Sequence, residues 1–115
     1  MIKLNHKKLT VYQYSIDLVK EIYSLTEKFP TSEKFGLVSQ LRRASVSIPS
    51  NIAEGSARSS DAERKRSLQI ARSSLVEVDT QIEIALKLEY LNENDITHLS
   101  DLSNQVFAML SKMMK

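Results

Sequence analysis

The sequence predicts an all-α protein, an antiparallel up-down four-helix bundle that forms a single domain over residues 1–115. Two observations support this prediction. Hydrophobic residues recur every three or four positions in four segments, which is the period of an α-helix. Only two glycines and two prolines occur among the 115 residues, too few for the turns of many short strands. The links between segments are short, which favours antiparallel neighbours.

The first helix is predicted to follow Thr10, a suitable N-cap, and to end at Phe29. The residue before Pro30 avoids helical backbone, and this sets the end. The second helix is predicted to begin near Ser32 and to end close to Gly55.

Pro49 lies inside the apolar stripe of the second helix. A proline there removes the hydrogen bond to the Ser45 carbonyl and clashes with that group. Because the apolar period continues to Ile52, we expect a helix that is kinked but continuous. Three serine hydroxyls are available to the freed backbone groups: Ser45, Ser47 and Ser50.

The third helix is predicted from the capping box at Ser60–Glu63 to about Leu91. Its core seam follows a heptad pattern: Leu68, Ala71, Leu75, Val78, Ile82 and Ala85. A second stripe of mixed polarity lies beside it and suggests a second contact surface: Ile70, Ser74, Glu77, Gln81, Ile84 and Leu88. The fourth helix is predicted to begin near Asn94 and to run to Met113.

Several classes of protein do not fit this sequence. No cysteine occurs, so neither a disulfide framework nor a thiolate metal site is expected. No apolar run approaches the roughly 20 residues of a membrane span, and the first twelve residues are too polar for a secretory signal. We therefore expect a cytoplasmic protein with no membrane partner.

Catalytic motifs are also missing from the sequence. It contains neither a Gly-x-Ser-x-Gly nucleophile motif nor a Gly-rich phosphate loop. Neither His6 nor His98 lies in a Glu-x-x-His motif of the kind that di-iron bundles use. We expect no enzyme activity, no metal and no cofactor.

Charge is unevenly distributed along the chain. Residues 1–41 carry a net charge of +2, residues 42–72 carry +4, and residues 73–115 carry −4. Every arginine lies within the middle block. These residues, with one lysine, are the candidate nucleic-acid-binding set, expected at one end of the bundle: Arg42, Arg43, Arg58, Arg64, Lys65, Arg66 and Arg72. Arginine binds phosphate well because its planar fork donates two hydrogen bonds at once.

A structural interpretation of the same arginines stays open. Glu54 and Arg58 form an i,i+4 pair, and Glu77 is within reach of Arg43 or Arg72 if the helices pack as expected. A second set of polar residues is interpreted as a buried hydrogen-bonded network that sets helix register, since buried polar groups must be paired: Asn51, Glu54, Glu77 and Gln81.

Residues 40–55, which read QLRRASVSIPSNIAEG, resemble the signature of the 23S rRNA intervening-sequence protein family. Residues 9–13, 29–37 and 70–81 are similar to the family's opening, first link and third helix, in the same order. Tyr12 stands where the family usually has Trp, and Ser73-Ser74 where a Gly-Ser pair is more common.

The resemblance implies a long antiparallel bundle that assembles into homopentamers and has no established enzyme activity. A related accessory protein of diversity-generating retroelements shares this architecture, binds nucleic acid and works with a reverse transcriptase. Two functions are therefore compatible with the sequence. The chain is either a homo-oligomer that binds RNA or DNA backbone, or an oligomeric scaffold that binds itself and a protein partner.

Overall fold

The computed structural model describes all 115 residues as helices and short links, without a strand. The four α-helices are α1 (Thr10–Thr26), α2 (Leu37–Ala57), α3 (Asp61–Lys87) and α4 (Thr97–Met113). Three short 3-10 helices stand in the leader and in two links: η1 (Asn5–Lys8), η2 (Thr31–Glu33) and η3 (Glu93–Ile96). The predicted all-α four-helix bundle is confirmed. No helix is long and apolar enough to span a lipid bilayer.

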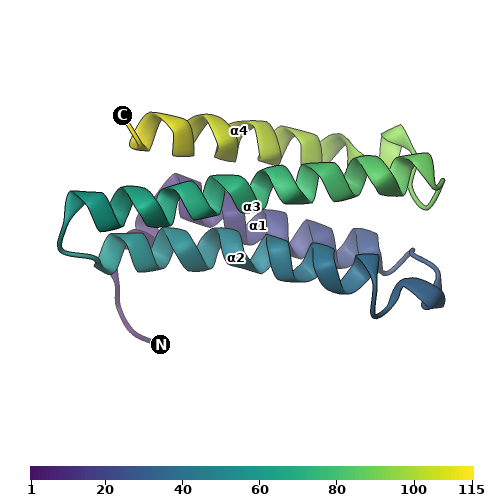
Figure 1. The fold of residues 1–115 in the computed structure, drawn as a ribbon, viewed down its shortest axis with the longest axis horizontal. Helices are drawn as coiled ribbons and strands as arrows, with labels where there is room; N and C mark the ends of the chain where they lie inside the picture. The colour runs from purple at the N-terminus through teal and green to yellow at the C-terminus, as the bar shows by residue number, and fades with distance from the viewer.

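The helices lie along the long axis of a body measuring 44 × 26 × 21 Å, and successive helices run in opposite directions (Figure 1). The α2–α3 link and both chain termini lie at one end, whereas the α1–α2 and α3–α4 links lie at the other (Figure 1). This placement determines which charged segments meet.

Helices α2 and α3 share the most extensive contact of any helix pair. Ser47 and Ser74 are joined by a hydroxyl–hydroxyl hydrogen bond of 2.9 Å, and the Gln81 amide donates to Gln40 Oε1 at 3.4 Å. A step of seven residues forward on α3 therefore matches a step of seven back on α2, as in antiparallel helices. At Gly55 the helices approach so closely that an added Cβ would lie 3.1 Å from the Ser67 Cβ.

The core is a single cluster of 22 buried hydrophobic residues drawn from all four helices and the links. All six residues of the predicted core seam of α3, from Leu68 to Ala85, are buried, which confirms that seam. The α3 N-terminus also begins as expected, because the Ser60 hydroxyl accepts a hydrogen bond from the Glu63 amide at 3.1 Å.

Four predicted helix ends are wrong. Helix α1 ends at Thr26, whose hydroxyl donates to the Ile22 carbonyl at 2.7 Å. Helix α2 begins at Leu37 rather than near Ser32, because residues 31–33 form the separate 3-10 helix η2 and the Glu33 carboxylate accepts from the Leu37 amide.

The other two incorrect ends are at the α3–α4 link. Helix α3 stops at Lys87, and Glu89 takes a left-handed conformation with φ of 64°. Asn92 rather than Asn94 acts as a cap: its side chain and that of Asp95 exchange hydrogen bonds with each other's backbone amides at the start of η3. Helix α4 itself then begins at Thr97.

Helix α2 continues through Pro49, as expected. The Ser45 hydroxyl donates to the Arg42 carbonyl at 2.9 Å, and the Ser47 hydroxyl pairs with Ser74. Neither hydroxyl bonds to the Ser45 carbonyl that the proline leaves free. The kink itself stays a prediction.

Candidate nucleic-acid interface

The seven predicted basic residues do not form one cluster. Arg58 follows α2, while Arg64, Lys65 and Arg66 lie in the first two turns of α3, so these four are together at the α2–α3 link. Arg42 lies in the second turn of α2, which starts only at Leu37. The 16 residues between Arg42 and Arg58 correspond to about 24 Å of helix. The prediction that Arg42 and Arg43 join the end cluster is therefore wrong.

Arg42 joins α2 to the C-terminal turn of α1. Its Nε donates to the Thr26 hydroxyl at 2.9 Å, and its guanidinium lies over the Tyr23 ring, 4.4 Å from the centroid. The Glu27 carboxylate is 3.7 Å away. With its donors and its planar face used inside the bundle, Arg42 is a packing residue.

Arg72 makes a similar link between α3 and α4. Its Nη1 donates to the Ser111 hydroxyl at 3.2 Å, and its guanidinium lies 5.8 Å from the Phe107 ring centroid. Arg64 pairs with Asp61 at 2.8 Å, but both groups are exposed, so this pair contributes at most about 1 kcal/mol.

Five of the seven residues have no carboxylate within 4.0 Å: Arg43, Arg58, Lys65, Arg66 and Arg72. The ion pairs proposed from the sequence, Glu54 with Arg58 and Glu77 with Arg43 or Arg72, are not formed. The cations at the α2–α3 link therefore remain available to a ligand.

The two chain termini bring further cations to the same end. Lys3, Lys7 and Lys8 lie in the leader and η1, and Lys112 and Lys115 lie at the end of α4, both at the end occupied by the α2–α3 link (Figure 1). Sequence reasoning did not include these lysines, although an up-down bundle with an even number of helices places both termini at one end.

Charge is consequently divided along the long axis. Dividing each α-helix near its midpoint gives a half that contains the α2–α3 link, called here the basic half, which comprises residues 1–18, 48–73 and 105–115. It carries ten basic and four acidic residues, a net charge of +6. The acidic half, residues 19–47 and 74–104, carries six basic and ten acidic residues, a net charge of −4. The overall charge of +2 hides this separation.

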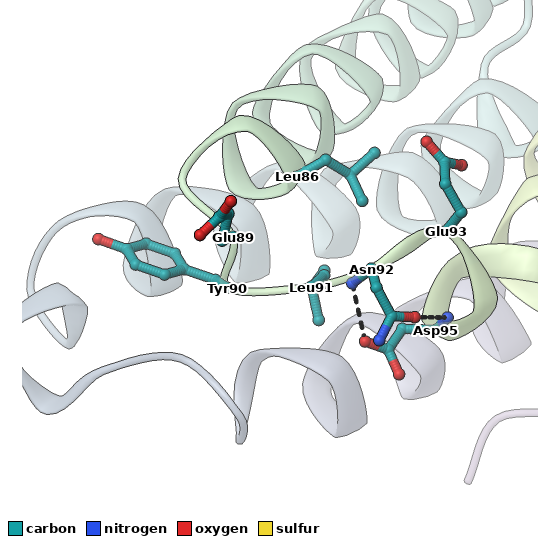
Figure 2. Close-up of a pocket in the computed structure, with 7 residues that line it drawn as sticks. All are labelled: Leu86, Glu89, Tyr90, Leu91, Asn92, Glu93 and Asp95. Atoms are coloured by element: carbon teal, nitrogen blue, oxygen red, sulfur yellow. Dashed lines mark hydrogen bonds between the residues drawn. The ribbon is translucent and has the colours of Figure 1, made fainter.

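The far end of the acidic half contains a shallow pocket at the α3–α4 link, shown in Figure 2. Its lining residues are Leu86, Glu89, Tyr90, Leu91, Asn92, Glu93 and Asp95. The Asn92 backbone amide donates to Asp95, and Lys28 lies 2.9 Å from the same carboxylate; together they hold the Asp95 pKa below its ordinary value. The Tyr90 hydroxyl donates to Glu33 at 2.9 Å, and this bond raises the Tyr90 pKa.

These polar groups connect the two links at that end of the bundle. Lys28 and Glu33 come from the α1–α2 link, while Asp95 and Tyr90 come from the α3–α4 link. Because these groups pair with one another across the two links, their positions are accounted for without a bound ligand. No group of three or more His, Asp or Glu side chains in the protein is placed to hold a metal ion.

The prediction of one buried polar network is wrong: of its four residues only Gln81 is buried, and the hydrogen bonds form two separate parts on the α2–α3 seam. In one, Asn51 Nδ2 donates to the carbonyl and hydroxyl of Ser47 at 2.8 and 3.0 Å. In the other, Gln81, which is only 6% exposed, donates to Glu77 at 3.1 Å and to Gln40. Glu54 is exposed and belongs to neither part. Ser47 and Gln40 could not be assigned to these hydrogen bonds beforehand, because both take part only through the register of α2 against α3.

Taken together, the fold and the site define a four-helix bundle protein with a basic and an acidic end. The family model described as 23S rRNA-intervening sequence protein matches residues 7–112, so the chain belongs to this family. A solved structure from Bacteroides thetaiotaomicron, described as a protein with unknown function from the S23 ribosomal protein family, has the same fold. It is 22% identical with a TM-score of 0.84, and the match covers 92% of this chain and 99% of that one. Comparison with curated proteins gives no match.

Proposed function

We propose that this protein is a non-catalytic nucleic-acid-binding protein that holds the phosphate backbone of RNA on its basic half and acts in the cytoplasm as a homo-oligomer, a pentamer by family resemblance. The supporting observation is the net charge of +6 on one half of the bundle. The family's name, which refers to sequences within 23S rRNA, favours RNA over DNA.

The chemistry of the basic half suits backbone rather than base recognition. Arg58, Lys65 and Arg66 are exposed and unpaired at the α2–α3 link. No aromatic residue lies between Arg58 and Arg72, so stacked bases have no platform there. Binding through phosphates is expected to have little sequence preference and to weaken steeply with salt.

Assembly would strengthen such binding. If the copies of a ring lie parallel, their basic halves face the same side, and one RNA strand can contact several copies. Contacts on linked copies act at high effective concentration, so affinity rises without any new type of contact.

A scaffold that binds itself and a protein partner is the second candidate. It is favoured by the large apolar side chains exposed on α1, α2 and α3, among them Ile16, Val46 and Ile84. Exposed apolar surface of this extent is typical of interaction sites. The two candidates differ in whether the basic half contacts RNA.

Replacing Arg58, Arg64 and Arg66 with Gln tests the proposal. The matched control replaces three exposed cations of the acidic half, Arg43, Lys34 and Lys87, and changes the net charge equally. The measurement is RNA affinity at several salt concentrations, with helicity checked by circular dichroism.

The basic-half variant is expected to bind more weakly, with a slope of log K against log salt shallower by about 2, since each lost phosphate contact removes about 0.7. The control variant is expected to keep most of the RNA affinity and most of the salt dependence. Equal affinity for the basic-half variant and the unmodified protein, or an equal loss in the control, would contradict RNA binding by the basic half.

A further inference from the structure

Helix α3 carries two heptad seams. The first is buried in the core, whereas the second contacts α2 only through Ser74 and Gln81 and is otherwise in solvent. The second seam follows the spacing of four and three residues that is typical of coiled-coil contacts: Ile70, Ser74, Glu77, Gln81, Ile84 and Leu88. Its large apolar members stay in solvent, with Ile70 43%, Ile84 44% and Leu88 50% exposed. A helix surface of this kind fits against another helix pair.

The middle of the second seam has more hydrogen-bond acceptors than donors. The buried Gln81 Oε1 has no hydrogen-bond partner, although the Nε2 of the same amide donates to Glu77 and Gln40. The Glu77 carboxylate has no cation within 4.0 Å. A cation arriving from outside the chain would complete this layer.

A groove between α1 and α2 has the complementary character. Its walls are mainly apolar, with Ile16, Val19 and Tyr23 from α1 and Val46 and Pro49 from α2. Lys20 is the one charged residue that lines it, and its ammonium group has no ion-pair partner. The groove therefore has apolar walls and one positive charge, Lys20. The second seam of α3 has apolar residues and one negative charge, Glu77.

We propose that the second seam of α3 in one copy of this chain packs into the α1–α2 groove of a second copy, with Glu77 paired to Lys20 of the second copy. The two faces are different, so the contact is head-to-tail and each copy can bind one neighbour on each side. They lie on adjoining sides of the bundle, because α2 packs against both α1 and α3. Successive copies are therefore turned relative to one another, which favours a closed ring. This inference rests on the homo-oligomer of the proposed function.

The axial register of the helices agrees with this pairing. Gln40 lies level with Gln81 and Ser47 with Ser74, so residues near Ala44 of α2 are level with Glu77. Arg42 contacts Tyr23, which places Tyr23 at nearly the same level. Lys20 is three residues from Tyr23, about 4.5 Å along the axis. In two parallel copies, Lys20 thus comes within a side-chain length of Glu77.

The apolar residues Ile16 and Ile70 then lie on the same side of the Lys20–Glu77 pair, about one helical turn apart in level. Ile16 precedes Lys20 by one helical turn and Ile70 precedes Glu77 by two turns, and both lie on the side toward the basic half. Parallel copies also place all basic halves on one side of the ring. The inferred interface therefore provides the arrangement from which several copies can bind one RNA.

The test is a charge exchange, read as the solution mass by light scattering coupled to gel filtration. The single variants Lys20→Glu and Glu77→Lys are expected to reduce the mass, because each places like charges opposite one another. The double variant, Lys20→Glu with Glu77→Lys, is expected to restore it. The controls Lys34→Glu and Asp101→Lys change exposed charges outside both faces and should leave the mass unchanged.

A single variant that keeps the full mass, or a folded double variant that stays dissociated, overturns the proposed interface. Neither result contradicts a homo-oligomer of the unmodified protein. A monomeric unmodified protein overturns both the interface and the homo-oligomer. RNA affinity measured on the same samples is a separate reading. RNA binding by a protein that is monomeric would contradict the proposed interface but would still support the proposed nucleic-acid binding.

Discussion

Leu75 provides a quantitative test of the α3 core assignment. The side chain is 3% exposed within the central cluster, and Leu→Ala at such sites costs about 2–5 kcal/mol through lost transfer energy and the cavity that remains. We expect Leu75→Ala to lower the free energy of unfolding by about 3 kcal/mol. For a chain of this size that corresponds to a fall of roughly 10–20 °C in Tm. Urea unfolding followed by circular dichroism, at one fixed protein concentration, measures the change.

The adjacent residue supplies the control. Val76 is 51% exposed on the same helix, so Val76→Ala is expected to change stability by no more than about 0.5 kcal/mol. The larger change Leu75→Asp, which buries an unpaired charge, is expected to unfold the protein. If the two alanine variants lose equal stability, or if Leu75→Asp remains folded and fully helical, the assignment of the core face of α3 is wrong.

Two further predictions concern groups that link the helices. Arg42→Lys removes the planar contact with Tyr23 and is expected to cost about 1 kcal/mol in thermal unfolding while RNA affinity stays unchanged; a large loss of affinity would contradict its assignment as a packing residue. The Asp95 pKa is lowered from 3.8 in the folded protein, so its stabilising effect is present above that value and is lost as the pH falls below about 4. Asp95→Asn should therefore lose less stability than the unmodified protein in acid unfolding, and an unchanged acid profile would count against this contribution.

The core and the helix count could be predicted from the sequence because they depend on local periodicity. The spacing from Leu68 to Ala85 alone indicated which face of α3 would be buried, and Ser60 indicated where that helix would begin. The other ends depend on competing local structure. Residues 31–33 form a 3-10 turn that Glu33 links to Leu37, and Asn92 forms a cap with Asp95 before α4 begins.

The candidate site could be predicted only in part, because it depends on which segments meet in space. Arg58, Lys65 and Arg66 are close in sequence and also close in the fold. Arg42 was misplaced because it was grouped with Arg58 by sequence block, although most of α2 separates the two residues. The lysines of the two termini were missed because those near the N-terminus are more than a hundred residues from those near the C-terminus. The up-down arrangement of the helices brings both groups to one end of the bundle.

Lysine footprinting tests directly whether RNA lies on the basic half. The ten lysines divide between the halves, so each protein–RNA sample contains its own control. Chemical acetylation with and without RNA, read by mass spectrometry, is expected to show protection of the basic-half lysines: Lys3, Lys7, Lys8, Lys65, Lys112 and Lys115. The acidic-half lysines, Lys20, Lys28, Lys34 and Lys87, should react equally in both samples. Protection of the second group in place of the first, or no protection at saturating RNA, would contradict binding by the basic half.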